Sequence, residues 1–148
     1  MKTLLDPAWY ERVLSRVRAL RPETPARWGR MTAPQMLAHL CDQMRYTLGE
    51  YRVTLHRGPL RWPPVKHAIM FWLPWPKGRI KGSPEMFLTP PVTWSADLVT
   101  FQSLLDRFVA KSSATVWPEH PFFGTMTRES WARFSYRHFD HHLRQFGA

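Results

Sequence analysis

The chain contains a single cysteine, Cys41, among its 148 residues. One cysteine cannot form an intramolecular disulfide, and it excludes a metal site built from several cysteines. The fold must therefore be stabilised by its core, for which 8 Trp and 9 Phe supply ample apolar surface. Lone-cysteine usage of this kind is typical of a reducing compartment, so we expect a cytoplasmic protein.

Long apolar runs are also missing. The longest, residues 68–75, is interrupted by Pro74 and is far shorter than the about 20 residues that a membrane-spanning helix requires. Residues 1–7 lack the apolar centre of a signal peptide and contain an acid and a proline instead. We therefore expect a soluble protein with no membrane partner.

Acidic residues are few, because 11 Asp and Glu face 21 Lys and Arg, for a net charge of +10. Such an excess suits nucleic acid, an anionic membrane or an acidic ligand, and an arginine-rich proteome would also produce it. The basic residues are scattered without a block of five or six like charges, and no nucleic-acid motif occurs. We expect no nucleic-acid partner.

Four segments carry the start signals of helices. Asp6 precedes Pro7, which is a capping residue followed by proline at the first helical position. Thr32 lies three residues before Gln35, the pattern of a capping box. Apolar residues recur at three- and four-residue steps inside the segments. The predicted helices run from Pro7 to about Leu20, from Ala33 to about Tyr51, from Ser95 (with Asp97) to about Lys111, and from the Thr127 cap to Gly147.

The segment from Tyr51 to Trp94 differs in character, because it holds eight of the 14 prolines together with several tryptophans and phenylalanines. A short helix fits between Pro64 and Leu73. The aromatic residues predict an ordered connection, and long ordered connections often form lids or site walls. At 148 residues, with 44% hydrophobic and 22% charged residues, we expect a single domain over residues 1–148. The predicted fold is all-α: an up-down-up-down four-helix bundle with this Pro/aromatic-rich connection between helices two and three.

The last predicted helix carries a histidine pair. His138 and His142 are four residues apart, so their imidazoles lie one turn apart on one face and both can reach one divalent ion. An HxxxH pair also occurs without metal, as two partly exposed histidines. His141 is an alternative to either one, although it lies toward the edge of the face. The same face carries Trp131, Phe134 and Gln145, which favours a position inside the bundle.

A third ligand must come from another helix, and His39 in the second predicted helix is the best candidate. Helical spacing leaves its role open, because His39 lies well away from the most obvious apolar stripe. If that stripe alone is buried, His39 is a surface histidine. The stripe consists of Leu37, Leu40, Cys41, Met44 and Leu48.

Residues 31–40 (MTAPQMLAHL) and 138–147 (HFDHHLRQFG) together resemble the DinB/YfiT-like superfamily. Within it, the chain is most similar to a domain-of-unknown-function branch with a Trp-Gly-x-Met sequence before helix two and a His-Pro-x-x-Gly loop before helix four. Residues 28–31 (WGRM) and 120–124 (HPFFG) match these two motifs, so the resemblance covers nearly the whole chain.

The resemblance implies a four-helix bundle in which His39, His138 and His142 bind one divalent ion. Characterised relatives include thiol-dependent transferases and isomerases and metal-dependent hydrolases, so a small-molecule substrate or a low-molecular-weight thiol is the expected partner. Relatives of this shape often pair, which favours a homodimer. A shared fold does not supply the substrate.

Three imidazoles leave coordination positions open, as catalytic sites do, and zinc or nickel there would lower the pKa of bound water or of a thiol. His120 is a candidate acid or base, and Gln145 or Gln43 could hydrogen bond a ligand. Asp42 or Asp140 could orient an imidazole. Each of these residues also suits an ordinary helix or loop position.

Two classes of function follow. The first is an enzyme, either a metal-dependent hydrolase or a thiol-dependent transferase. The second is a non-catalytic, stress-associated binding module with weak or no metal. Cys41 is a poor candidate for a nucleophile, because no partner base is identifiable and its helix position suits a small buried residue. Metal content and the thermal shift on adding metal discriminate between the two classes.

Overall fold

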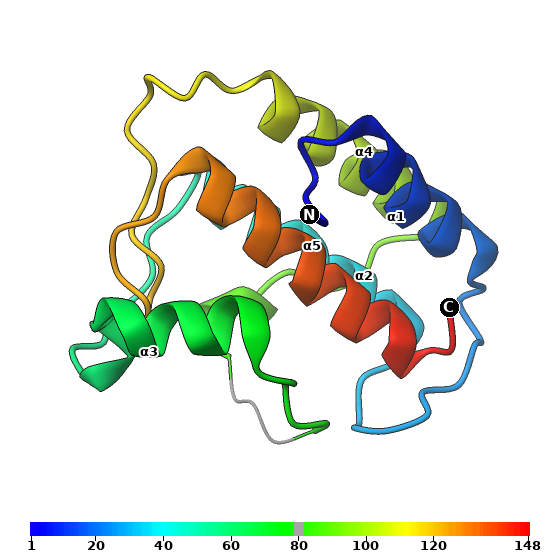
Figure 1. Cartoon of the computed structure of the whole chain (residues 1–148). Helices are drawn as coiled ribbons and strands as arrows, with labels where there is room; N and C mark the ends of the chain where they lie inside the picture. Colours follow the sequence, from blue (N-terminus) through cyan, green and yellow to red (C-terminus); the bar gives the residue numbers. More distant parts are fainter. Residues whose placement is uncertain (79–81) are drawn as a thin grey trace.

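The computed structural model describes residues 1–78 and 82–148, and within these ranges its regular structure is helical (Figure 1). No strand occurs there; His120 and Gly124 form one isolated antiparallel bridge. The all-α class is therefore confirmed. The α-helices are α1 (Pro7–Ala19), α2 (Ala33–Leu48), α3 (Pro63–His67), α4 (Trp94–Ala110) and α5 (Arg128–Gln145). Shorter helical turns are η1 (Pro59–Arg61), η2 (Ala68–Trp72) and η3 (Pro84–Phe87).

The start of α2 has the predicted capping box. The Thr32 hydroxyl accepts a hydrogen bond from the Gln35 amide at 3.3 Å, and the Gln35 side chain accepts one from the Thr32 amide at 2.9 Å. The helix ends at Leu48, before the predicted end near Tyr51, because Gly49 adopts the left-handed conformation (φ +87°) that terminates helices. The caps of α1 and α5 are also the predicted ones, Asp6 and Thr127.

The predicted start of α4 at Ser95 is wrong, because the helix begins at Trp94 with Thr93 as its cap. The Thr93 hydroxyl accepts from the Ala96 amide at 3.3 Å. Thr93 has the extended backbone that a cap requires, whereas Ser95 already lies inside the helix. The Asp97 carboxylate accepts from the Val92 amide at 3.1 Å and holds the preceding chain in place.

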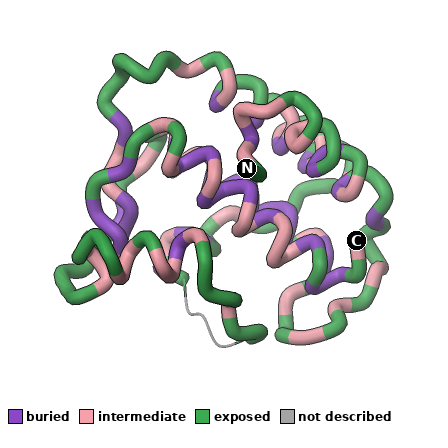
Figure 2. Tube along the Cα trace, in the orientation of Figure 1, coloured by how far each residue is buried: buried purple, intermediate pink, exposed green. Residues whose placement is uncertain are grey.

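Helix α2 is the most deeply buried helix, because other elements pack around it. It contacts α4, α5 and η3, while α1 packs against α4 and α5 (Figures 1 and 2). The predicted apolar stripe faces α4, where Cys41 approaches the Asp97 carbonyl. The other faces of α2 are covered too, so His39 is only 5% exposed. The alternative of a surface histidine at this position is therefore wrong.

The connection between α2 and α4 covers the side of the molecule where α2 meets α5. Helices α3 and η2 run on continuously from Pro63 to Trp72, close to the predicted short helix. Arg137 of α5 donates hydrogen bonds to the carbonyls of Met70 (2.9 Å) and Leu73 (2.8 Å), and η3 packs against α2. Residues 79–81 of the predicted connection lie outside the described residues. Among the described helices, none combines the length and the apolar character needed to cross a bilayer.

The cap of α4 can be tested by paired substitutions. Thr93→Ala should lower the free energy of unfolding by about 0.5–2 kcal/mol, because the Ala96 amide loses its acceptor. Ser95→Ala should change it by less than about 0.5 kcal/mol. Urea denaturation measures both, and a larger loss from Ser95→Ala than from Thr93→Ala would contradict the assignment.

Candidate metal centre

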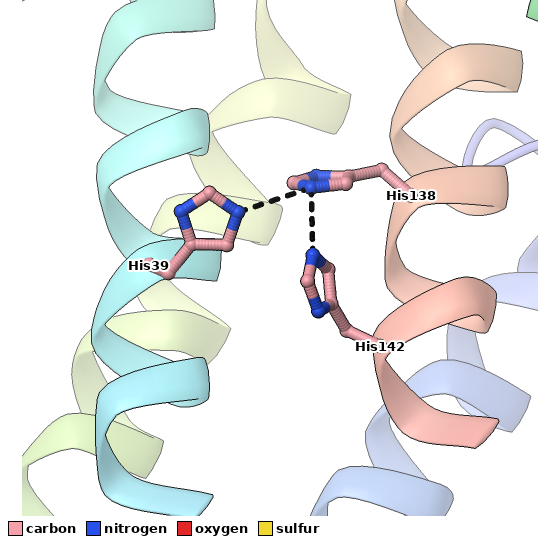
Figure 3. Close-up of side chains that lie close together, drawn as sticks. All are labelled: His39, His138 and His142. Carbon is pink, nitrogen blue, oxygen red and sulfur yellow. Dashed lines mark hydrogen bonds between the residues drawn. The ribbon is translucent and has the colours of Figure 1, made fainter. Parts of the chain in front are cut away.

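Three imidazoles from two helices converge on one point. His39 extends from α2, and His138 and His142 lie one turn apart on α5 (Figure 3). The His138 Nε2 atom lies 3.1 Å from the Nε2 atoms of both His39 and His142, and one ligand atom from each residue lies within 4.8 Å of the others. Nitrogen ligands about 2.0–2.1 Å from a tetrahedral ion are themselves about 3.3–3.4 Å apart. The spacing therefore fits a single bound ion.

Two of the imidazoles are oriented by oxygen atoms behind them. His39 Nδ1 donates to the Met86 carbonyl at 2.8 Å, and His142 Nδ1 donates to Gln145 Oε1 at 2.9 Å. The Gln145 amide cannot be reversed without loss, because its Nε2 donates to the Trp28 carbonyl at 2.8 Å. A carbonyl or amide oxygen only accepts, so each Nδ1 carries the proton and each Nε2 presents a lone pair.

Gln145 is held in place by the backbone of residues 28 and 29, which passes close to its side chain. Gly29 has φ +78°, and a Cβ atom there would lie 2.6 Å from Gln145 Nε2. A glycine is therefore required if the Trp28 carbonyl is to reach Gln145. This contact gives a structural reason for the Trp-Gly pair in the WGRM motif.

The third imidazole, His138, is oriented by Gln43. Thr47 donates its hydroxyl proton to the Gln43 main-chain carbonyl at 2.9 Å, so its oxygen accepts from Gln43 Nε2 at 2.7 Å. The Ser135 hydroxyl accepts from the same nitrogen at 3.1 Å. Gln43 Oε1 therefore faces His138 Nδ1, at 3.4 Å, the longest of the three contacts behind the imidazoles.

All three imidazoles are neutral near pH 7. Burial is the main cause that lowers the pKa of all three: that of His39 falls, that of His142 falls to about 3, and that of His138 falls well below its ordinary value. The neighbouring histidines lower the pKa of His138 and of His142 further. Three Nε2 lone pairs thus face one another at a buried point. If His138 carried its proton on Nε2, it could donate to one of the two neighbouring Nε2 atoms. Its Nδ1 would then turn a lone pair toward the Gln43 Oε1 atom, which also only accepts. A metal cation would accept all three Nε2 lone pairs and so remove the repulsion between them.

No Asp or Glu among the described residues hydrogen bonds to the three imidazoles. The Asp42 carboxylate instead accepts from Arg45 Nη1 at 3.0 Å and from the Thr89 amide at 3.1 Å. Asp140 pairs with Arg16 at 2.7 Å. The alternative in which Asp42 or Asp140 orients an imidazole is therefore wrong, and both are ordinary helix residues. Neutral amides and a carbonyl orient the imidazoles instead, and the Asp42 carboxylate acts on His39 only through its charge, which raises the pKa of that imidazole against the effect of burial.

Aromatic rings surround the three histidines. Phe87 of η3 stacks on His39 with ring centroids 4.4 Å apart and planes 5° apart. Phe134 stacks on His138 at 5.9 Å, and Trp75 lies 6.3 Å from the same imidazole. Phe87 and Trp75 come from the connection before α4, which therefore supplies walls of the site. His138 is partly exposed, so the cluster is not sealed from solvent.

His120 and Gln145, the candidate catalytic residues, occupy different positions. Gln145 contacts His142, as described above, whereas His120 lies outside the three-histidine cluster. His120 Nδ1 accepts from the amides of Phe122 (3.2 Å) and Phe123 (3.3 Å), and burial lowers its pKa to about 3. These contacts give His120 a role in ordering its loop.

Two other residues considered from the sequence also lie outside the cluster. Cys41 faces α4, and burial raises the pKa of its thiol to about 12, so it is protonated at neutral pH and unsuited to nucleophilic attack. His141 lies beside the cluster, with its ring centroid 5.3 Å from that of His142.

Sequence reasoning missed the Met86 carbonyl behind His39 and the Trp28 carbonyl behind Gln145. Main-chain carbonyls occur at every residue, so no side-chain pattern marks the two that are used. The ring of Phe87 over His39 was also missed, because its position depends on how the connection folds back. The glycine of the WGRM motif was the one available signal.

The buried, neutral state of His120 predicts a pH dependence of stability. The folded pKa of about 3 lies below the value of about 6.5 expected in the unfolded chain, so unfolding takes up a proton between these values. Stability should fall as the pH drops below about 6.5 and continue to fall toward 3. His120→Asn, whose Oδ1 can still accept from the two amides, should reduce this slope by up to about 1.4 kcal/mol per pH unit. Urea denaturation from pH 7 to 4 tests this, and an identical slope in the variant would contradict it.

Comparisons with curated proteins and with solved structures gave no match. A family model described as "Protein of unknown function (DUF1569)" matches residues 5–148, which include all four long helices and the three histidines. The chain therefore belongs to the DUF1569 family.

Proposed function

We propose that the chain binds one divalent metal ion, zinc or nickel, through the Nε2 atoms of His39, His138 and His142. The observation that carries the proposal is the set of acceptor oxygens behind the three Nδ1 atoms, which turns three lone pairs toward one point. Neutral imidazole suits zinc and nickel as well as copper and iron, so the ligands by themselves do not select among these ions. Three protein ligands leave at least one coordination position for a substrate.

We further propose that the chain is a single domain with the up-down-up-down four-helix bundle of the DinB/YfiT-like superfamily. In support, α1 and α2 each pack against both α4 and α5, as the four helices of a bundle would. The ligand pattern, with one histidine on the second long helix and two spaced by four on the last, is the one that this resemblance implies.

The reaction that we infer is a thiol-dependent transfer onto a small molecule. A bound divalent ion would lower the pKa of a thiol enough to hold it as a thiolate near neutral pH. A bound ion would lower the pKa of water in the same way, so hydrolysis is the second candidate reaction; within the described ranges no carboxylate hydrogen bonds to the cluster to assist it. The rings of Phe87, Trp75 and Phe134 offer apolar surface beside the same point, against which a small molecule could pack.

The metal site predicts a defined stoichiometry. The full chain without a histidine tag should bind about one equivalent of Zn²⁺ or Ni²⁺, and metal should raise its Tm. His138→Ala should weaken binding by more than about 100-fold, because it removes the ligand that contacts both of the others. His67→Ala, which removes an exposed histidine of α3, is the matched control and should bind as the parent does. Isothermal titration calorimetry and elemental analysis measure these values.

Less than about a tenth of an equivalent of metal, with no thermal shift, would contradict the metal site and favour a non-catalytic binding module. If metal binds, activity on an electrophilic model substrate should require an added thiol. Hydrolysis of a model ester without thiol would instead favour a metal-dependent hydrolase.

The contact between Gly29 and Gln145 predicts a remote effect on metal affinity. Gly29→Ala should displace Gln145 from His142 and weaken metal binding by about 10–100-fold, as Gln145→Ala should. Gly49→Ala is the control: Gly49 also has positive φ (+87°), but a Cβ there meets no atom within 4 Å. It should cost about 1 kcal/mol of stability and leave metal affinity unchanged. Equal affinity losses in the two glycine variants would refute a specific role for Gln145.

A further inference from the structure

A groove of about 250 Å³ lies beside the three-histidine cluster. Two residues that line the groove also adjoin the cluster. The centroid of the His141 ring lies 5.3 Å from that of His142, and the centroid of the Trp75 ring lies 6.3 Å from that of His138. The groove is lined by Trp28, Pro74, Trp75 and Lys77 on one side and by Arg137, Asp140, His141 and Arg144 of α5 on the other.

The groove carries an excess of positive charge, since three cations and one carboxylate line it. The carboxylate, Asp140, is already paired with Arg16 of α1 at 2.7 Å and with Arg144 Nε at 2.9 Å. Its charge is therefore neutralised partly from outside the groove. A ligand placed between the two walls meets a positive potential.

The three cations differ in how far they are engaged. Arg137 uses both terminal nitrogens on the carbonyls of Met70 and Leu73, so its role is to hold the connection on α5. Lys77 Nζ lies 4.7 Å above the Trp28 ring, and within residues 1–78 and 82–148 no oxygen accepts from it. The Arg144 side chain is 64% exposed, and among the described residues it is held through Nε alone. Lys77 and the outer nitrogens of Arg144 are therefore the donors that a ligand would meet.

We propose that this groove binds the carboxylate of an anionic low-molecular-weight thiol, with Lys77 and Arg144 as the groups that recognise it. The inference rests on the proposed function and names the class of thiol that the metal centre uses. Trp28 and Trp75 supply flat apolar walls against which the aliphatic part of such a molecule packs. A guanidinium and an ammonium are the usual partners of a carboxylate.

Two thiols of equal length separate the contribution of the carboxylate from that of the sulfur. The full chain loaded with Co²⁺ is titrated with 3-mercaptopropionate and with the neutral 3-mercaptopropanol, and thiolate coordination is followed by its charge-transfer absorbance. The parent protein should bind the charged thiol about fivefold to tenfold more tightly. Lys77→Gln should reduce this preference by roughly threefold or more.

Lys2→Gln is the matched control, because Lys2 also lies over a tryptophan ring, that of Trp9, but outside the groove. It removes the same charge and should keep the full preference. Equal affinity for the two thiols in the parent protein would overturn the proposal. An equal loss of preference in the Lys2 and Lys77 variants would also overturn it, because general attraction to a basic chain would then explain the preference.

A second arm needs no metal and so separates the failure of this inference from that of the metal site. Acetate titrated into the metal-free protein should shift the NMR signals of the Trp28 and Trp75 indole N–H groups in the parent and in Lys2→Gln, and less in Lys77→Gln. If Co²⁺ fails to bind while these shifts occur, the metal proposal fails and the anion site stands. If Co²⁺ binds and no shift occurs, the anion site fails and the metal proposal stands.

Discussion

The structure depends on one constraint: three imidazoles, of which His39 is buried and His138 partly exposed, are each fixed from behind by an oxygen that can only accept a hydrogen bond. The other elements are arranged to supply those oxygens. Helix η3 brings the Met86 carbonyl to His39, and α2 itself provides Gln43 for His138. The chain before α2 supplies the Trp28 carbonyl, which accepts from Gln145 and holds its oxygen toward His142. The fold thereby determines the protonated nitrogen of each imidazole and places three lone pairs at one point, an arrangement that is costly to bury without a cation.

The groups that hydrogen bond to the three imidazoles are neutral, and this affects the chemistry that a bound ion could support. Carboxylates behind metal-bound histidines raise the basicity of the ligands, whereas amides and carbonyls leave the charge of an ion uncompensated. A divalent ion held by neutral ligands would add to the positive potential of Lys77 and Arg144 in the adjoining groove. Anionic ligands, including thiolates, would be attracted to both places.

Local signals in the sequence predicted the helices well, and long-range packing decided the rest. Capping residues such as Thr32 act within one turn, so their effect can be read from neighbouring residues. The start of α4 was missed because Thr93 and Ser95 are both good caps, and the conformation of the preceding chain chooses between them. The burial of His39 depends on α5 and η3, which are distant in sequence, and only the resemblance of the motifs favoured it as a ligand.

The central claim is that one ion is held by three imidazole nitrogens, and X-ray absorption spectroscopy of the zinc-loaded full chain tests it most directly. The account predicts a first shell containing nitrogen at about 2.0–2.1 Å, with the outer-shell scattering of three imidazoles. The outer-shell scattering should drop to that of two imidazoles in His39→Ala, which removes the ligand from α2. A first shell of oxygen alone, or a spectrum with one imidazole or none, would contradict the account.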